Sequence, residues 1–370
     1  MENRLNRMRA CMDEQGIDCF CSTDLSNVKW LTGFEGVFDD EPAHALFVSA
    51  DDARMHTDSR YADAATRAAA HTPWRVETSR ASHAAWVLDA AAAHANARVL
   101  GIEDSMTLAA YRALERQARA REDAEAHVPS LFETSDFVRS LRAVKDAAEV
   151  RAMKKAQAVT DAAFEHIVGF MRIGMTEREV QLELEASMRK MGADDLAFSS
   201  IVASGANGAA PHSIPGEKRL ERGDMVVLDF GARKDGYCSD MTRTVCMGRA
   251  SDEARRVYAA VRAANEAVEA ALGPGVTGAE AHELAESVLA REGYAGTMGH
   301  GLGHGVGIDI HELPNLSPRN AAPLSVGNVV TVEPGVYLSG SLGCRLEDFG
   351  IITPDGFEVF TQSSHELVII

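Results

Sequence analysis

Two aspartates, Asp229 and Asp240, stand eleven residues apart in a segment whose pattern predicts a β-hairpin. Their flanks, Met225–Ala232 and Tyr237–Met247, read as strands and are joined by Arg-Lys-Asp-Gly, a turn sequence. Side chains alternate between the two faces of a strand, so we expect both carboxylates on one face of this hairpin. Opposed like charges destabilise a hairpin, which predicts a positive group between them.

The position of the turn decides how the two aspartates face each other. A two-residue loop at Lys234-Asp235 sets Asp229 directly opposite Asp240. A loop at Asp235-Gly236, the stronger turn dipeptide, sets Asp240 opposite Gly231, with Asp229 diagonally beside it. Both registers keep the carboxylates on the same face.

A second acidic pair, Glu333 and Glu347, is arranged in the same way. Apolar runs with strand character, Asn328–Leu338 and Gly343–Thr353, flank a short turn sequence. Gly340 is the midpoint between the two glutamates, so an odd-length loop centred on it places them opposite each other.

His304, in a glycine-rich segment, adds one imidazole to these four carboxylates. Hard oxygen donors with one nitrogen suit Mn²⁺, Co²⁺, Fe²⁺ or Zn²⁺ better than a thiolate-binding metal. Two divalent ions neutralise four carboxylate charges, and one ion does not. Two metals about 3.5–4 Å apart can activate a bridging hydroxide and polarise a carbonyl or phosphoryl oxygen. The set therefore predicts a dinuclear metal site, with Mn²⁺ as the first expectation.

The elements that position these residues divide into two domains, as expected for 370 residues. The polar stretch Leu131–Asp136 predicts a boundary, giving an N-terminal domain of residues 1–132 and a C-terminal domain of residues 138–370. In the first domain we expect an α/β order of short strands and helices. Its predicted elements are helix Arg4–Gln15, strands Asp18–Cys21, Ala45–Val48 and Arg54–Thr57, helix Ser82–Ala95, strand Arg98–Ile102 and helix Thr107–Ala118.

Four long helices accompany the acidic hairpins of the second domain. One of them begins at Thr176 with Glu179 three residues later, which is a capping-box signature. The predicted helices are Asp146–Met171, Thr176–Met191, Ser251–Leu272 and Thr277–Glu292.

With these motifs the chain resembles the pita-bread metallopeptidases, a family that includes methionine aminopeptidase, aminopeptidase P, prolidase and the metal-free creatinase. The family's Asp, Asp, His, Glu, Glu ligand pattern is matched here in residue type and order. The segment beginning His56-Thr-Asp-Ser-Arg-Tyr resembles the creatinase-type N-terminal domain. The resemblance covers essentially the whole chain. It implies the α/β (α+β) class, with a small α/β N-terminal domain before a curved antiparallel sheet backed by helices.

The resemblance also implies roles for the ligands. Asp229 is expected to hold one metal, Asp240 and Glu347 to bridge both, and His304 with Glu333 to complete the second. The metal-bridging hydroxide is then the nucleophile that attacks the scissile carbonyl. Either Glu333 or Glu347 is the proton shuttle.

Further residues match the substrate side of the family's site. His212 and His311 are expected to donate hydrogen bonds to the scissile carbonyl oxygen, and His300 to line the substrate pocket. Arg345 lies two residues before Glu347, on the same strand face, and is expected to orient acidic groups. Tyr337 is a weaker candidate for the same task and for the substrate pocket.

The spacing of His304 and His311 requires irregular backbone. Seven residues separate them, so a regular strand would put them on opposite faces. We expect Gly305 and Gly307 to break that regularity, because His311 cannot otherwise reach the site.

Within the family, the residues favour enzymes that act before proline. About 130 residues resemble the creatinase-type domain, which methionine aminopeptidases lack, and creatinase lacks the ligand set. Some prolidases carry an arginine four residues after the second histidine, where this chain has Asn315, with Arg319 nearby as a substitute. This difference favours a Xaa-Pro aminopeptidase over a Xaa-Pro dipeptidase. The alternatives from other classes are a hydrolase or lyase of a small amide or carboxylate metabolite and a non-catalytic peptide-binding protein.

Composition excludes several partners. The formal net charge is −18 and no basic stripe stands out, which argues against nucleic-acid binding. No run approaches the roughly 20 apolar residues of a membrane span, and no signal-peptide core follows the start. The six cysteines are scattered and favour buried thiols in a reducing, cytoplasmic compartment. The family resemblance implies a homodimer.

Overall fold

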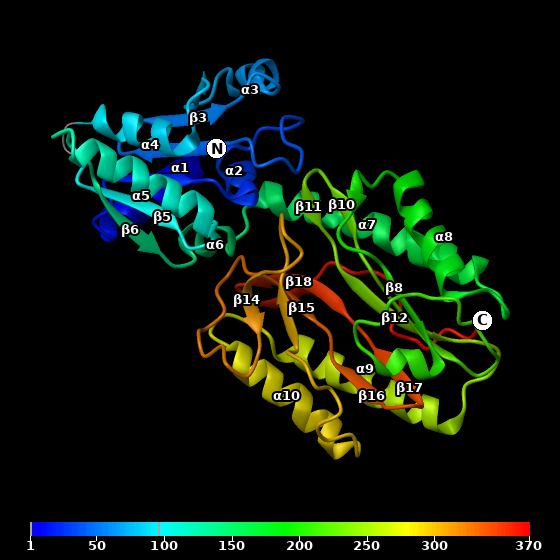
Figure 1. Cartoon of the computed structure of the whole chain (residues 1–370). Helices are drawn as coiled ribbons and strands as arrows, with labels where there is room; N and C mark the ends of the chain where they lie inside the picture. Colours follow the sequence, from blue (N-terminus) through cyan, green and yellow to red (C-terminus); the bar gives the residue numbers. More distant parts are fainter. Residues whose placement is uncertain (1, 95–96) are drawn as a thin grey trace. The chain divides into compact units, whose positions relative to one another are not determined.

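The computed structural model describes residues 2–94 and 97–370, and the chain forms two compact units, Met1–Arg142 and Ala143–Ile370 (Figure 1). The stretch predicted to separate the domains contains a strand, β6 (Ser130–Thr134), which pairs with its neighbour in the first unit. The first unit then continues through α6 (Phe137–Arg142). Phe137 stacks on Phe20 with ring centroids 4.8 Å apart, so the hydrophobic core of the first unit extends up to this helix.

The first unit is built on one six-stranded sheet of order β4-β3-β2-β1-β5-β6. Its antiparallel pairs are β1–β2 and β2–β3, and its parallel pairs are β3–β4, β1–β5 and β5–β6. The mixture of pairings is the α/β arrangement that the sequence predicts. The strands before β6 are β1 (Cys19–Ser22), β2 (Ala45–Ser49), β3 (Ala53–Thr57), β4 (Arg75–Thr78) and β5 (Val99–Glu103).

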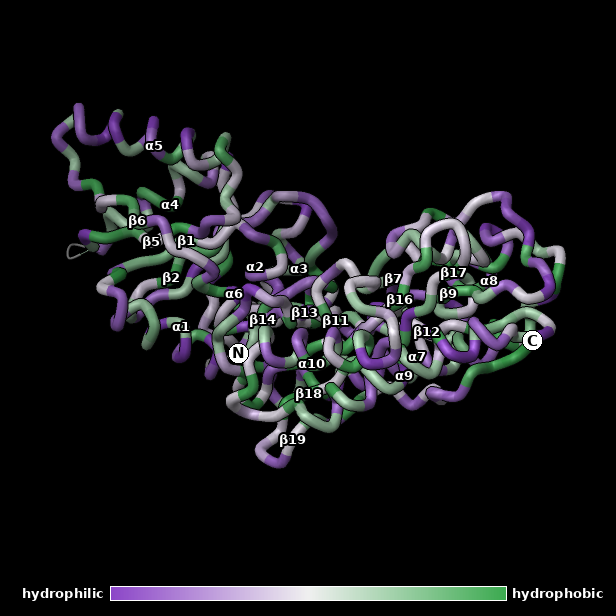
Figure 2. The backbone as a smooth tube through the Cα atoms, turned by 90° about the horizontal axis from the view of Figure 1, so that it is seen from below, coloured by the Kyte–Doolittle hydropathy of each residue, from purple (hydrophilic) through white to green (hydrophobic). Residues whose placement is uncertain are grey.

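Helices cover both faces of this sheet. Cys21 and Phe47 on one face pack against buried residues of two helices, including Trp86 and Leu114. On the other face Phe20 meets α6. The helices before α6 are α1 (Glu2–Glu14), α2 (Leu25–Thr32), α3 (Ala62–Ala69), α4 (His83–Ala92) and α5 (Leu108–Glu122). Figure 2 shows hydrophilic and hydrophobic residues alternating along α5, as a helix with one buried face requires. The end predicted for α4 at Ala95 lies outside the described residues.

The first half of the second unit places two helices on an antiparallel sheet. Strands β8 (Ile201–Ser204), β9 (Met225–Phe230) and β12 (Met241–Cys246) form the sheet β12-β9-β8. A smaller sheet continues it with β7 (Asp195–Leu196), β10 (Ala232–Lys234) and β11 (Tyr237–Cys238). Helices α7 (Ala147–Phe170) and α8 (Glu177–Lys190) bury Phe164 and Leu184 against Leu228 and Phe230.

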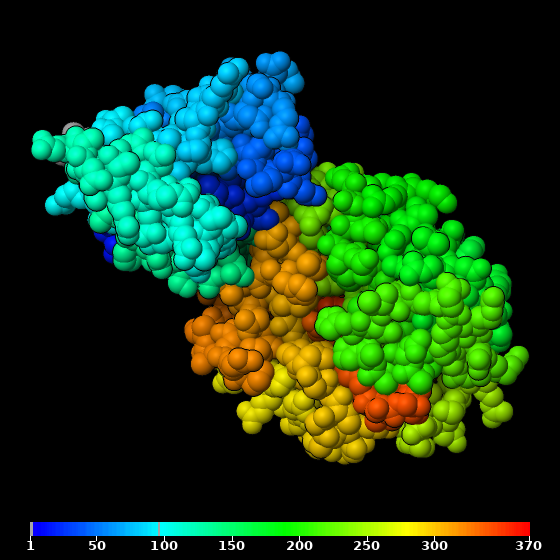
Figure 3. Space-filling model, in the orientation of Figure 1, coloured from blue at the N-terminus to red at the C-terminus, as the bar shows by residue number. Residues whose placement is uncertain are grey.

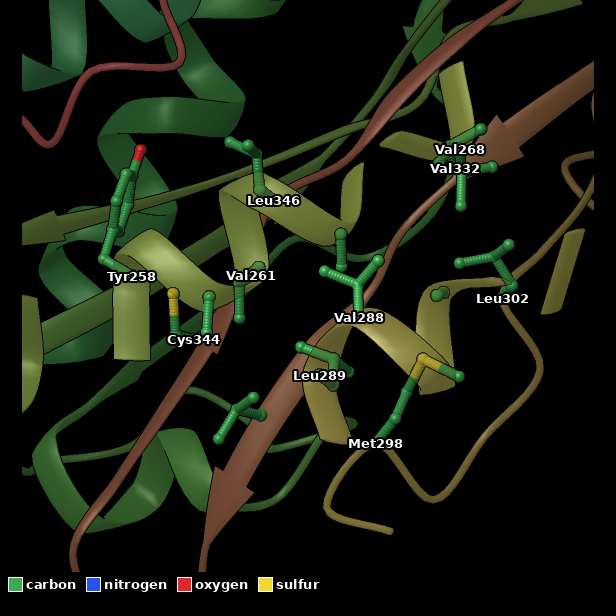
Figure 4. Close-up of a cluster of buried hydrophobic side chains, with 14 of the residues drawn as sticks. Tyr258, Val261, Val268, Val288, Leu289, Met298, Leu302, Val332, Cys344 and Leu346 are labelled. Atoms are coloured by element: carbon green, nitrogen blue, oxygen red, sulfur yellow. The ribbon is translucent and has the colours of Figure 1, made fainter. Parts of the chain in front are cut away.

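The second half repeats this arrangement with a larger sheet. Helices α9 (Asp252–Ala271) and α10 (Gly278–Arg291) pack on it, and their core appears in Figure 4. The sheet of order β14-β13-β15-β18-β19 consists of β13 (Gly303–Gly305), β14 (Glu312–Leu316), β15 (Val329–Val332), β18 (Asp348–Thr353) and β19 (Gly356–Val359). A separate hairpin joins β16 (Gly335–Leu338) to β17 (Leu342–Arg345). The antiparallel sheets backed by helices are the architecture that the resemblance implies.

The four predicted helices of this unit are confirmed, and side-chain caps fix where they start. Thr176 caps α8 and forms a capping box with Glu179, as predicted. The same reciprocal box begins α7 and α10, and Ser251 caps α9. These caps satisfy backbone N–H groups that the first turn of a helix leaves without partners.

Strand alternation ties the acidic residues to the hydrophobic core. Val332 and Leu346, which directly precede Glu333 and Glu347, are fully buried among residues of α9 and α10 (Figure 4). Leu228 packs beneath α7 and α8 while its neighbour Asp229 points to the other face. Asp229, Glu333 and Glu347 are therefore each positioned by a buried apolar neighbour in the chain.

All six cysteines are free thiols, and five of them are buried. Burial raises the pKa of Cys238 and of Cys344 to about 12, so both are inert packing residues. Across residues 2–94 and 97–370 no helix combines the length and apolarity that crossing a bilayer requires.

Candidate metal centre

The first acidic pair lies on the hairpin formed by β9–β10 and β11–β12. Arg233 pairs with Cys238 and Asp229 with Thr242, so Asp240 falls opposite Gly231. This is the register predicted for a loop at Asp235-Gly236, and both of those residues have positive φ, 51° and 79°. A tight two-residue turn with both central residues left-handed matches the twist of its strands.

The second pair lies where two stretches of one long hairpin meet. Gly335 pairs with Arg345 on one side of the glutamates, and Val332 with Asp348 on the other. Both pairings share the centre Gly340, so Glu333 and Glu347 occupy opposite positions in the predicted register. Glu347 also bridges to Thr242, which brings the second hairpin against the first.

His304 joins the two pairs. Its Nε2 lies 3.5 Å from Asp240 Oδ2 and 3.6 Å from Glu333 Oε1. Ligand atoms of Asp240, His304 and Glu347 all lie within 4.8 Å of one another. Burial lowers the pKa of His304 to about 4, so its imidazole is neutral at physiological pH and can donate a lone pair.

The electrostatics of the cluster call for added positive charge. Burial, together with neighbouring carboxylates, raises the pKa of Asp240 and Glu347 well above the ordinary range and that of Glu333 to about 8. Asp229 Oδ1 is buried and accepts no hydrogen bond from the described residues. Orphaned oxygen, neutral imidazole and crowded carboxylates together fit divalent cations as the missing partners.

Among the described residues, Arg345 is the one arginine in contact with the carboxylates of this cluster, and its side chain is almost fully buried. Its Nη2 donates to Asp229 Oδ2, and its Nε lies 4.0 Å from Glu333 Oε2. Nε also donates to Thr242 Oγ1. Arg345 therefore places a positive charge beside Asp229 and Glu333, and its location agrees with the expected orienting task.

A hydrogen-bonded chain runs from Arg345 toward the rim of the site. Arg345 Nη1 donates to Tyr337 Oη at 2.8 Å, and His300 Nε2 lies 3.0 Å from the same oxygen. His300 Nδ1 lies 2.7 Å from the carbonyl of Gly301. Burial lowers the pKa of His300 to about 4, so the chain joins a charged guanidinium to a neutral imidazole.

His311 reaches His304 because the backbone between them is irregular, as predicted. Their rings meet edge to face with centroids 4.3 Å apart. The strand register shifts between Gly303 and Gly305, and the chain bends through residues 307–311. A Cβ at Gly305 would lie 2.4 Å from the carbonyl of Leu313, so this glycine is required for close approach.

The bend before His311 is fastened by its neighbour Glu312. Glu312 pairs with the buried Lys145 at 3.2 Å and accepts a hydrogen bond from Asp309 N. A Cβ at Gly307 would lie 2.4 Å from the Glu312 carboxylate. Glycine at 307 thus makes room for the group that holds His311 in place.

His212 stands on an exposed loop whose position depends on Glu177, a residue that sequence reasoning missed. Glu177 is fully buried at the start of α8. It accepts hydrogen bonds from Ser204 N and Oγ, from Asn207 Nδ2 and from Gly216 N, so it holds both ends of the loop. The 3₁₀ turn η1 (Gly205–Ala209) lies within this span. Nothing in the local sequence distinguishes Glu177 from the other acids of α8.

Two threonines were also missed, although strand alternation could have indicated them. Thr242 lies two residues after Asp240 and donates to Glu347 Oε2 at 2.7 Å. Thr331 lies two residues before Glu333, and its Oγ1 accepts from His304 N at 3.0 Å. Both share a strand face with a carboxylate of the site.

The site surrounds a cavity of about 810 Å³. The predicted site residues that line it are His212, Asp229, Asp240, His300, His304, His311, Glu333, Arg345 and Glu347. Tyr337 lies behind this wall, in contact with His300 and Arg345. Figure 3 shows the second unit hollowed between its green and orange parts, with red atoms of a later segment behind.

A second cluster of potential ligands, Glu269, Asp348 and His365, has a different character. Arg243 donates to Asp348 at 2.6 Å and to the carbonyl of Ser363. The buried Arg243 guanidinium already supplies positive charge to this cluster. Its bonds to Asp348 and to Ser363 attach the C-terminal segment to β18.

The fold and this site define a pita-bread hydrolase that depends on divalent metal. Residues 151–354 match metallopeptidase family M24, and residues 4–144 match the creatinase/prolidase N-terminal domain. The chain belongs to metallopeptidase family M24.

Three relatives show how far the likeness extends. The chain is 37% identical to the uncharacterized peptidase YqhT of Bacillus subtilis, over 99% of this chain and 100% of that protein. It is similar to a solved Xaa-Pro dipeptidase from Bacillus anthracis, with TM-score 0.91, 37% identity and 100% and 99% of the two chains covered. It is also similar to a solved X-Pro aminopeptidase from Thermotoga maritima, with TM-score 0.86, 33% identity and 99% and 100% covered.

Proposed function

We propose that this chain is a Xaa-Pro aminopeptidase, which removes the first residue from peptides with proline in second position. Solved relatives carry both dipeptidase and aminopeptidase names, so the proposal depends on the cavity wall. At the position where some prolidases have a carboxylate-binding arginine, Asn315 lines the cavity. The uncharged Asn315 offers no cation to bind a C-terminal carboxylate at this point, so a longer peptide can continue past it. This observation carries the proposal.

We assign two divalent ions, Mn²⁺ first, to Asp229, Asp240, His304, Glu333 and Glu347. The hard donor set with one neutral imidazole supports this assignment. When bound, such ions supply Lewis-acid activation of a carbonyl and lower the pKa of water toward neutrality.

The chain's own groups orient the peptide and move protons. His212 and His311 are proposed to donate hydrogen bonds to the scissile carbonyl oxygen as negative charge develops on it. Burial lowers the pKa of His311, so it acts as a neutral donor. We assign the proton shuttle to Glu333, because its side chain is 17% exposed at the cavity, whereas Glu347 is almost fully buried and engaged by Thr242.

Substrate length tests the proposal. With Mn²⁺-loaded enzyme, kcat/KM for a Xaa-Pro-Yaa tripeptide should exceed that for the Xaa-Pro dipeptide by about tenfold, because nothing at Asn315 rewards a terminal carboxylate. Steady-state kinetics with ninhydrin detection of the released residue measures this ratio. Faster cleavage of the dipeptide would instead identify a Xaa-Pro dipeptidase, the second candidate. Cleavage of neither peptide by a fully loaded enzyme would favour a small-metabolite hydrolase.

The loop that carries His212 gives a second test. Glu177→Ala should lower kcat on the tripeptide by about tenfold with unchanged metal content, because His212 loses its fixed position. Glu177→Gln keeps one acceptor oxygen and should lose less. The matched control is Glu165→Ala, which removes an exposed carboxylate from α7. Equal loss of metal and activity in Glu177→Gln would contradict this positioning role, and elemental analysis beside the kinetics detects it.

A further inference from the structure

A second cavity of about 770 Å³ opens beside the catalytic one, within the second unit. The two cavities share four lining residues, His300, Gly301, Asn315 and Ser317. A chain that enters the catalytic cavity can therefore continue past Asn315 into the second cavity.

The wall between the cavities is firmly held. Asn320 Nδ2 donates to the carbonyl of Asn315 at 2.6 Å, and Ser317 Oγ donates to Asn315 Oδ1 at 2.7 Å. The carbonyl of Asn320 accepts from Ala279 N, at the start of α10. These bonds hold residues 315–320 in a tight turn. They thereby fix the backbone position from which the Arg319 side chain extends at the cavity.

The second cavity offers groups for an anion. Arg319 lines it, is exposed, and forms no ion pair with any described residue. His282 Nδ1 is buried and without a hydrogen-bond partner within the described chain. Glu286 is the one acidic residue among the described residues on this lining, and Arg319 balances its charge, so the cavity does not repel a carboxylate.

We propose that the second cavity binds the part of the peptide beyond proline, with the Arg319 guanidinium pairing with the C-terminal carboxylate. This inference rests on the proposed function. Arg319 is the one lysine or arginine among the described residues that line the second cavity, so a carboxylate that reaches this cavity meets a cation there. Arg319 is absent from the lining of the catalytic cavity, so a dipeptide held there does not use it.

The test compares free acids with amides on substrates of increasing length. Ala-Pro, Ala-Pro-Ala and Ala-Pro-Ala-Ala, with matching C-terminal amides of the longer two, are assayed on Mn²⁺-loaded wild type and Arg319→Gln. The KM of a longer acid should rise about tenfold in Arg319→Gln, with its amide and the dipeptide unchanged, because one charge-assisted pair is lost. Arg256→Gln, an exposed arginine on α9, is the control with the same change of charge.

A binding measurement separates this proposal from the proposed function. Calorimetry with Pro-Ala-Ala and its amide, which need not be cleaved, should show tighter binding of the acid to wild type and equal binding of both to Arg319→Gln. If the substrates are not cleaved but this binding pattern is observed, the proposed aminopeptidase function is wrong and the proposed subsite at Arg319 stands. Cleaved substrates with no difference between acid and amide, no binding of Pro-Ala-Ala, or an Arg319 effect greatest on Ala-Pro, would overturn the subsite.

Discussion

Glu347→Gln should reduce turnover at least about a thousandfold and lower the metal content together with it. The change keeps the size of the side chain and an oxygen that can accept from Thr242 Oγ1. It removes one of four carboxylate charges at the proposed centre. Loss of a ligand charge weakens binding of both ions if Glu347 bridges them, as the resemblance implies.

The same variant should be more stable than wild type when metal is absent. Burial and the neighbouring Asp240 raise the pKa of Glu347, so at neutral pH the metal-free fold must either protonate this carboxyl group or hold its charge beside Asp240, and both cost free energy. Removing one charge relieves that cost, and added Mn²⁺ then raises the melting temperature less than in wild type.

Thermal unfolding with and without Mn²⁺, beside elemental analysis, checks both effects, and Glu165→Gln on exposed α7 is the control. A fully active Glu347→Gln enzyme with two bound ions would exclude the proposed ligand set.

Arg345→Met should lower the free energy of unfolding of the metal-free protein by about 3 kcal/mol, because the buried Asp229 side chain loses the guanidinium that pairs with it. Arg345 is 3% exposed and contacts Asp229, Thr242 and Tyr337. Turnover should fall as well, since Asp229 loses the donor that orients it. Arg345→Lys keeps the charge but not the planar fork, and it should restore less than half of the stability.

Urea unfolding measures this difference, and Mn²⁺ should recover part of it in Arg345→Met because divalent ions neutralise the same carboxylates. The contrary result is an unfolding free energy equal to that of wild type without metal. It would mean that the contacts of Arg345 with Asp229, Thr242 and Tyr337 do not stabilise the metal-free fold.

The hairpins of the site could be predicted because turn chemistry and strand period are local. Asp235-Gly236 supplies two left-handed residues, and the symmetric spacing around Gly340 fixes the second register. The four helices of the second unit were equally accessible, since each begins with a capping side chain such as Thr176. The contact between the two hairpins, at Thr242 and Glu347, needed tertiary structure.

Other features depend on residues far apart in the chain. Glu177 meets Ser204, Asn207 and Gly216 only after α8 docks on its sheet, and no periodicity marks such a contact. The strand β6 was missed because Ser130–Thr134 is short and largely exposed, so its pairing with β5 outweighs its polar pattern.

The alternation of acidic and apolar residues on the same strands separates what can diverge in this protein from what cannot. Val332 and Leu346 fill the space under α9, while Glu333 and Glu347 face the cavity one residue away. A change in the spacing of the proposed metal ligands along a strand would also shift the apolar residues between them. The hydrophobic core would then have to repack at the same time, so neither change is favourable alone. New substrate preferences are therefore expected to arise at His212 and Asn315, whose exposed side chains border the cavity without being part of the core.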